Sequence, residues 1–240
     1  MLRSILVAVG ALRGRRASGA YGSGTGPIKA LAGALVLVLG LSLPNTGRAA
    51  DAITILGFGD SLMAGYGLGK ASSFPFQLQA ALTQRGHLVN VVNAGVSGDT
   101  TAGGKARLAW SLAENPDAVI LELGANDGLR GLDVEEMRAN LDAMLGELEK
   151  RGIPTLLAGM RAPPNMGRDY GRAFRQVYAD LARKYDVEFY PFFLDGVAAN
   201  ASLNQGDGMH PTAEGVSLIV ESILPTVEKL IERVQAKRAG

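Results

Sequence analysis

Residues 53–67 read ITILGFGDSLMAGYG and join a strand pattern to a turn that carries a serine. The β-branched, apolar start at 53–58 is short and does not strictly alternate, which is typical of a strand covered on both faces. Ser61 follows the turn, at the start of a predicted helix. Backbone N–H groups are free there, and the helix dipole favours negative charge. The passage therefore predicts a buried strand that presents a serine at the edge of a sheet.

Short apolar runs alternate with helical stretches along the rest of the chain. Further strands are expected at 88–92, 118–123, 155–158 and 187–190, with helices at 74–85, 100–112, 134–151, 169–185 and 212–236. Asp133 is a typical N-cap, Gly152 a typical helix stop, and Pro211 suits the first position of the last helix. This order predicts one α/β domain over 51–240, a three-layer α/β/α sandwich around a central five-stranded, mainly parallel sheet.

The polar loops of this predicted fold gather at one edge of the sheet. Ligands of such sheets bind at the carboxyl ends of the strands. The loops 59–69, 93–101, 124–131 and 204–210 all fall at that end. We therefore expect a single site built from these four loops.

Charge separates the first 50 residues from the rest. Residues 1–50 contain six basic and no acidic side chains, whereas residues 51–240 contain 18 basic and 23 acidic ones, a net charge of −5. An acidic body without a basic stripe disfavours binding to nucleic acid. We expect residues 51–240 to act as a monomer on small-molecule substrates.

The N-terminal segment has the layout of a secretory signal. An uncharged apolar run at 30–43 follows basic residues and precedes small ones that end in Ala49 and Ala50. The run is short for a span of the bilayer, so no stable membrane anchor is expected after cleavage. The chain has no cysteine, which excludes a lipoprotein anchor and disulfides. We expect a periplasmic or secreted bacterial protein, cleaved after Ala49 or Ala50.

The chain has two histidines, and either is a candidate for the base that would activate Ser61. His210 closes the stretch DGMH, in which Asp207 comes three residues earlier and can accept the Nδ1–H of the imidazole. That bond would fix the tautomer and leave Nε2 facing the serine. His87 follows a predicted helix stop at Arg85-Gly86, has no carboxylate nearby in the sequence, and is expected at the surface.

Two further residues are candidate donors to an oxyanion. The backbone N–H of Gly95 can approach a substrate without a Cβ in the way, and Asn126 can donate from its side-chain amide. Asn and Gly are also ordinary turn residues, so either alone is weak evidence.

Four ordered blocks together resemble the SGNH, or GDSL, hydrolase superfamily: GDSL at 59–62, Gly95, GAND at 124–127 and DGMH at 207–210. VSGDT at 96–100, LELGANDGLRG at 121–131 and PFF at 191–193 are similar to the bacterial periplasmic thioesterase I, lysophospholipase L1 and arylesterase group. The resemblance implies an SGNH or flavodoxin-like fold without metal or cofactor. It implies these roles: nucleophile, Ser61; base, His210; orienting acid, Asp207; oxyanion donors, Ser61, Gly95 and Asn126.

The nucleophile turn differs from that of the α/β-hydrolases. Residues 59–65 read GDSLMAG, so the Gly-x-Ser-x-Gly elbow is absent, which argues against that fold. The expected reaction is hydrolysis of an ester or thioester through an acyl-Ser61 intermediate. Apolar residues of the site loops could line an acyl groove: Leu62, Met63, Leu129, Met160 and Met209. Export favours lysophospholipids or other external esters; removal of acetyl groups from polysaccharides is the alternative within the hydrolases.

Two other classes of function use the same loops. A non-catalytic lipid- or glycan-binding protein could share the fold, because fold alone does not prove chemistry. A metal-dependent phosphoesterase could use four aspartates near the strand ends: Asp60, Asp99, Asp127 and Asp207. Histidine ligands are almost absent, which disfavours the second class.

Overall fold

The structure is a computed structural model that describes residues 52–240, so the expected signal segment and its cleavage site lie outside the described residues. Five strands form one sheet in the order β2-β1-β3-β4-β5, and every neighbouring pair is parallel. The strands are β1 (Ile53–Gly59), β2 (Val89–Gly95), β3 (Ala118–Glu122), β4 (Thr155–Ala158) and β5 (Glu188–Tyr190). The predicted five-stranded parallel sheet is confirmed.

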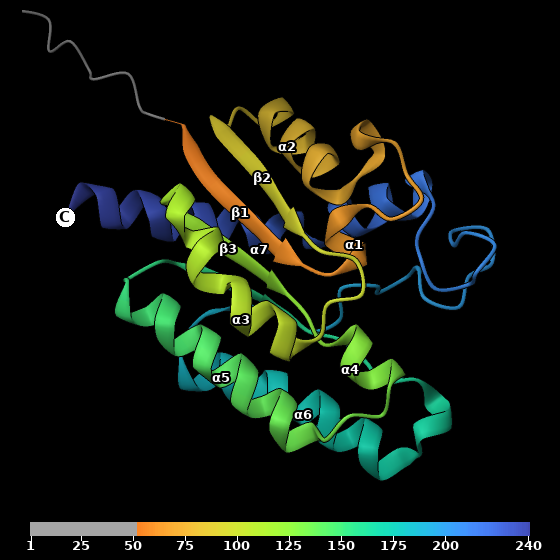
Figure 1. Cartoon of the computed structure of the whole chain (residues 1–240). Helices are drawn as coiled ribbons and strands as arrows, with labels where there is room; N and C mark the ends of the chain where they lie inside the picture. The colour runs from red at the N-terminus through yellow and green to blue at the C-terminus, as the bar shows by residue number, and fades with distance from the viewer. Residues whose placement is uncertain (1–51) are drawn as a thin grey trace, which may run out of the picture. The chain divides into compact units, whose positions relative to one another are not determined.

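Helices connect the strands and cover both faces of the sheet (Figure 1). The α-helices are α1 (Ser61–Ala64), α2 (Phe74–Gln84), α3 (Thr101–Ser111), α4 (Ala125–Leu129), α5 (Val134–Lys150), α6 (Arg168–Lys184) and α7 (Ala213–Ala239). Short 3₁₀ turns are η1 (Lys70–Ser72), η2 (Leu112–Glu114) and η3 (Pro164–Met166). Helices α2 and α7 pack together on one face, whereas α3, α5 and α6 pack side by side on the other. This is the predicted three-layer sandwich.

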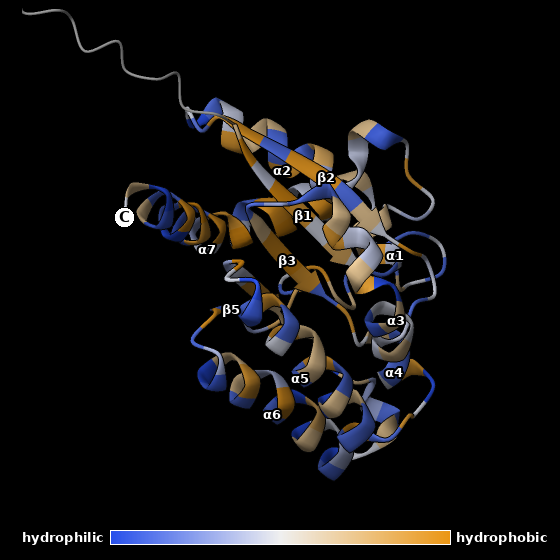
Figure 2. Cartoon of the chain, turned by 60° about the vertical axis from the view of Figure 1, so that its left-hand side comes forward, coloured by the Kyte–Doolittle hydropathy of each residue, from blue (hydrophilic) through white to orange (hydrophobic). Residues whose placement is uncertain are grey.

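Burial of apolar side chains between the layers holds the fold together. Every residue of β3 is buried, and Figure 2 shows β1 and β3 as hydrophobic over most of their length. The side chains of α5 that recur at three- and four-residue spacing are all buried: Met137, Leu141, Met144, Leu145 and Leu148. The periodicity in the sequence therefore identified the buried face of this helix.

Helix boundaries agree with the sequence at one end of α5 and differ at the start of α7. Asp133 caps α5, because its Oδ1 accepts the N–H groups of Glu135 at 2.7 Å and Glu136 at 3.2 Å. The prediction that Pro211 is the first residue of the last helix is wrong. Thr212 is the N-cap of α7 and its Oγ1 accepts the Gly215 N–H at 3.2 Å, so Pro211 lies before the helix.

The carboxyl ends of three neighbouring strands, β2, β1 and β3, are level with one another. Gly59 of β1 is in register with Gly95 of β2 on one side and with Glu122 of β3 on the other. Strand β2 runs to Gly95, three residues beyond its predicted end, and the short helix α4 occupies a segment predicted to be a loop. Within residues 52–240, no helix has the length and hydrophobicity to cross a membrane.

Candidate active site

Ser61 lies where β1 ends and α1 begins, at the end of the sheet where α4 also lies (Figure 1). Asp60 caps α1, because its Oδ1 accepts the N–H of Leu62 at 3.0 Å. Ser61 is thereby the first residue of the helix, and its N–H has no preceding helical turn to bond with. The turn places both the hydroxyl and the backbone N–H of Ser61 at the sheet edge.

The side chains of Ser61, His210 and Asp207 form a continuous hydrogen-bonded row. His210 Nε2 lies 2.9 Å from Ser61 Oγ, and His210 Nδ1 lies 2.6 Å from Asp207 Oδ2. The other carboxylate oxygen, Asp207 Oδ1, accepts the N–H groups of Met209 at 2.9 Å and His210 at 3.0 Å. Residues 149 positions apart in the chain therefore meet as a hydroxyl, an imidazole and a carboxylate.

Asp207 is held in its ionised form by the loop that carries it. The backbone N–H groups of His210 and Met209, and then the His210 ring, lower the pKa of Asp207 below its ordinary value. The ring of Tyr66 packs against that of His210, with 4.5 Å between ring centroids. Gln205 Nε2 donates to the Tyr66 carbonyl at 2.8 Å. These contacts tie the histidine loop to the segment that follows α1.

The three expected oxyanion donors lie at the ends of β1, β2 and β3, and protein acceptors engage two of them. The Gly95 N–H donates to Asn93 Oδ1 at 2.9 Å. Asn126 Nδ2 donates to Asp60 Oδ2 at 3.1 Å and to the Asp99 carbonyl at 2.9 Å. An oxyanion would therefore have to replace one of these acceptors at each of the two donors.

Gly95 has a second reason to be a glycine. A Cβ at this position would collide with the backbone of α1, in particular Ala64 N and Cα, and with the carbonyl carbon of Met63. Backbone atoms of a packed helix cannot move aside cheaply. The glycine thus lets α1 lie directly on the end of β2, in addition to leaving room for a substrate.

Two buried carboxyl groups lie beneath Ser61. Asp60 and Glu122 are both 0% exposed, and Glu122 Oε2 accepts the Asp60 N–H at 3.3 Å. Burial raises the pKa of Asp60 to about 6, although the Leu62 N–H and the Asn126 amide favour its charged form. Burial raises the pKa of Glu122 well above its ordinary value, and the negative charge of Asp60 raises it further. Among residues 52–240, Glu122 Oε1 has no hydrogen-bond partner.

Comparison with known proteins identifies the family. The model of the GDSL-like lipase/acylhydrolase family matches residues 58–218, about two thirds of the chain. The chain belongs to this family. It is accordingly an enzyme of the ester-hydrolase class.

The chain is similar to several named esterases along nearly their whole length. It is 40% identical over 202 residues to "Esterase TesA" of Pseudomonas aeruginosa, covering 84% of this chain and 98% of the relative. It is 36% identical over 187 residues to "Thioesterase 1/protease 1/lysophospholipase L1" of Escherichia coli, covering 78% and 88%. The crystal structure of AlinE4, an SGNH-hydrolase family esterase, matches with a TM-score of 0.65 and 49% identity, covering 76% of this chain and 98% of AlinE4.

The apolar residues expected to line an acyl groove fall into two groups. Leu62, Met63 and Met160 are buried in the core, with exposed fractions of 7%, 0% and 2%. Their side chains therefore offer little exposed surface to an acyl chain in this structure. Leu129 and Met209 are about half exposed, at 51% and 48%, on the site loops. Other large apolar side chains exposed on these loops are Tyr66 and Val96.

The four aspartates of the metal hypothesis serve four different local structures. Asp60 binds Asn126 and Asp207 binds His210, as described above. Asp99 Oδ2 accepts from Arg107 at 2.6 Å, and Asp127 accepts the Thr101 hydroxyl at 2.6 Å and its N–H at 2.9 Å. Residues 52–240 contain no cluster of three acidic, histidine or cysteine side chains suited to a metal ion.

His87 lies far from this site but does have an acidic neighbour. Its Nε2 is 3.3 Å from Glu228 Oε1 of α7, a carboxylate that the neighbouring sequence does not contain. The carboxylate is 141 residues away in the chain, which explains why the local sequence did not reveal it. Arg85 shares the same carboxylate at 3.0 Å, and this group has the character of a surface ion-pair cluster.

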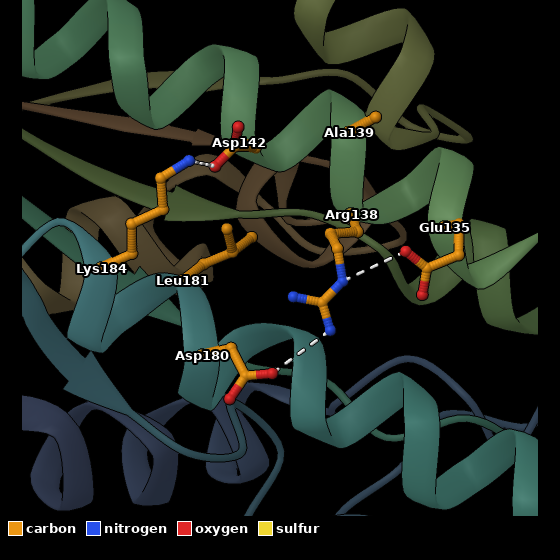
Figure 3. Close-up of a pocket in the computed structure, with 7 residues that line it drawn as sticks. All are labelled: Glu135, Arg138, Ala139, Asp142, Asp180, Leu181 and Lys184. Atoms are coloured by element: carbon orange, nitrogen blue, oxygen red, sulfur yellow. Dashed lines mark hydrogen bonds and ion pairs between the residues drawn. The ribbon is translucent and has the colours of Figure 1, made fainter.

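A hollow lies between α5 and α6, away from Ser61 (Figure 3). Its charges pair with one another. Arg138 contacts Glu135 at 3.4 Å and Asp180 at 3.3 Å, while Lys184 contacts Asp142 at 2.5 Å. Such pairing leaves little net charge to attract a ligand. We therefore do not assign a binding role to this hollow.

Three residues at the site were missed in the sequence. Glu122 gave a signal, because a charged residue ends an otherwise apolar strand, VILE. Asn93 and Arg107 gave none: an asparagine near a glycine is typical of any turn, and one arginine on a helix is typical of any exposed face. Only the packed structure shows that Asn93 engages Gly95 and that Arg107 reaches the strand ends.

Proposed function

We propose that this chain hydrolyses carboxylic esters and thioesters through an acyl-Ser61 intermediate. The observation that carries the proposal is the row from Ser61 Oγ to His210 Nε2, at 2.9 Å, and from His210 Nδ1 to Asp207 Oδ2, at 2.6 Å. A serine hydroxyl becomes a useful nucleophile when an oriented imidazole takes its proton. Family membership supports the same reaction class.

The reaction proceeds in two acyl transfers. Ser61 Oγ attacks the carbonyl carbon while His210 Nε2 takes the hydroxyl proton, and ionised Asp207 stabilises the imidazolium. His210 then returns the proton to the leaving alkoxide or thiolate as the bond between the acyl carbon and the leaving group breaks. Water attacks the acyl-serine with His210 as base, which releases the carboxylic acid and restores the serine.

Three donors would stabilise the negative oxygen formed in each step: the N–H groups of Ser61 and Gly95 and the amide of Asn126. The oxyanion takes the place of Asn93 Oδ1 at Gly95 and of one acceptor at Asn126. The two acceptors that hold the Asn126 amide in this structure are Asp60 Oδ2 and the Asp99 carbonyl. No metal or cofactor takes part in this sequence.

We propose fatty acyl esters and thioesters, including lysophospholipids, as the substrate class. The support is a set of apolar side chains exposed on the site loops, called the rim here: Tyr66, Leu129 and Met209, each about half exposed. The Tyr66 ring stacks on His210, and Met209 precedes it in the chain. Soluble proteins rarely gather large apolar side chains at one place on the surface without a binding role.

A panel of esters tests the reaction. The mature protein, Ser61→Ala and the matched control Ser97→Ala, an exposed serine of the β2–α3 loop, are assayed on p-nitrophenyl esters, an acyl thioester and a lysophospholipid. Ser61→Ala should lose activity by about 10⁴-fold or more, while Ser97→Ala retains it. Full activity of Ser61→Ala would refute the proposal.

Chain-length dependence tests the substrate class. Burial of each methylene group of the acyl chain against the rim contributes about 0.8 kcal/mol of favourable binding free energy. If that free energy is also present in the transition state, kcat/KM should rise by up to about fourfold per methylene from acetyl to longer chains. Leu129→Ser should flatten this rise, whereas Trp110→Ser, which removes an apolar side chain that is 81% exposed on α3, should not. A strict preference for acetyl esters would discard the fatty acyl class in favour of deacetylation of polysaccharides.

We further propose that the enzyme is exported as a monomer, with its leader cut after Ala49 or Ala50. The basic, apolar and small segments of residues 1–50 support this proposal. The mass of the protein recovered from a bacterial periplasm tests it. A recovered protein that retains residues 1–49 would contradict the cleavage.

A further inference from the structure

Arg107 of α3 extends its guanidinium to the ends of two strands. Its Nη2 donates to the Gly59 carbonyl at 2.8 Å, its Nη1 to the Ala94 carbonyl at 2.8 Å, and its Nε to Asp99 Oδ2 at 2.6 Å. The guanidinium lies over the Phe58 ring, 3.9 Å from the centroid, and the side chain is only 19% exposed. A planar fork with several fixed donors is what arginine offers and lysine does not.

Both carbonyls belong to peptide units that lead directly into the site. The Ala94 carbonyl shares a planar unit with the Gly95 N–H, so a donor on the oxygen fixes the direction of that N–H. The Gly59 carbonyl shares a unit with the Asp60 N–H, immediately before Ser61. Glu122 Oε2 holds that N–H at 3.3 Å, so the unit is fixed from both sides.

The third contact reaches Asn126 through Asp99. Arg107 binds the Asp99 side chain, and the carbonyl of the same residue accepts Asn126 Nδ2 at 2.9 Å. Arg107 therefore contacts two of the segments that carry the donors proposed for the oxyanion, and it is linked to the third through Asp99.

We propose that Arg107 is a positioning residue that aligns the oxyanion donors of Ser61, Gly95 and Asn126. It does not touch the substrate and acts through backbone carbonyls and Asp99. The inference rests on the proposed function, because alignment matters only if an oxyanion forms at these donors. A displacement of about 1 Å at such groups can cost about 10²-fold in rate.

Kinetics of Arg107→Lys and Arg107→Ala test the proposal, with Arg138→Ala as the matched control. Arg138 also pairs with two carboxylates, but on α5 and α6, away from Ser61. Both Arg107 variants should lose about 10²-fold in kcat on a p-nitrophenyl ester while KM stays within about threefold, since ground-state binding is untouched. Arg138→Ala should keep its kcat. Should Arg107→Ala fail to fold, Arg107→Lys, which keeps the charge and the stem, decides the matter.

Chemical rescue separates alignment from general support of the fold. Millimolar guanidinium should restore part of kcat to folded Arg107→Ala, whereas sodium chloride at equal ionic strength should not. A kcat within about threefold of the parent in a folded Arg107 variant would overturn the proposal. An equal loss in Arg138→Ala would overturn it as well. Ser61→Ala is assayed alongside: if it stays active, the proposed function fails; if it is inactive while the Arg107 variants are unaffected, only the role of Arg107 fails.

Discussion

Two aspartates lie beside the serine and the histidine in opposite environments. Asp60 precedes Ser61, is fully buried, and has its pKa raised to about 6 by that burial. Asp207 precedes His210 on an exposed loop, and the N–H groups of its own loop lower its pKa. The two halves of the site are therefore stabilised differently. The nucleophile half belongs to the core, whereas the base half is a surface loop shaped by its own hydrogen bonds.

The two halves should therefore respond differently to change. The nucleophile half is held by the register of three strands and by hydrogen bonds from Arg107 and to Glu122. We therefore expect it to unfold only together with the sheet. The base half depends on a few contacts, among them Gln205 N to the His210 carbonyl at 2.7 Å. Loops with few buried contacts open with the smallest free energies.

Asp207→Asn should give the largest effect and breaks the base half without unfolding it. The Asn oxygen can still accept the Met209 and His210 N–H groups, but its amide donates where the carboxylate accepted. His210 is then held in the wrong tautomer, and kcat should fall by about 10⁴-fold. Steady-state kinetics with Asp169→Asn as the control, a carboxylate that is 91% exposed on α6, measures the loss. A fall of less than about tenfold would contradict the role of Asp207.

Asn126→Ala should give the next effect and acts on the nucleophile half. Loss of one oxyanion donor should lower kcat by about 10²–10³-fold. The change also removes a hydrogen bond that lowers the pKa of Asp60, so that pKa should rise further. Kinetics and a pH titration of stability measure both results, with Asn165→Ala, an exposed residue of η3, as the control. An unchanged kcat would remove Asn126 from the proposed mechanism.

Glu122→Gln should change stability more than rate, because the amide can still accept the Asp60 N–H. The raised pKa of Glu122 means that the folded state keeps a proton that the unfolded chain releases above its ordinary pKa of 4.5. Folding stability conferred by Glu122 is therefore fully present below that pH and is lost as the pH rises toward the folded pKa. The glutamine variant should escape this loss.

Urea unfolding at pH 5, 7 and 9 measures the effect of Glu122→Gln. The variant should gain on the parent as the pH rises, whereas Glu149→Gln, on the exposed side of α5, should follow the parent. Parallel curves for Glu122→Gln and the parent would show that the buried carboxyl does not titrate as described.

Much of this architecture could be predicted because its signals are local or periodic. Apolar runs identified the five strands, and Asp133 marked the start of α5 through its own hydrogen bonds. The convergence of the four loops followed from the common edge of a parallel sheet. The contacts of Arg107 and the His87–Glu228 contact could not be predicted, because each depends on which side chain of one element meets another after packing. The Asn93–Gly95 bond lies within β2, but an asparagine near a glycine is typical of any turn and does not specify it.

The sequence also does not show which apolar side chains near the site are buried. Met63 and Leu129 both belong to segments at the sheet edge, yet the first is fully buried and the second half exposed. Met63 lies against Gly57 and Gly59 of β1, whose lack of side chains makes room for it. Hydrophobicity alone does not distinguish a residue beneath a site from one at its rim.

The most direct test of the account is the site of covalent capture by an alkyl fluorophosphonate. The reagent needs an activated nucleophile and mimics the tetrahedral intermediate once attached. Peptide mass spectrometry should find one adduct, on Ser61, formed much more slowly in His210→Ala and absent in Ser61→Ala. An adduct on another residue, or no adduct on the active parent enzyme, would contradict the claim that Ser61 is the nucleophile.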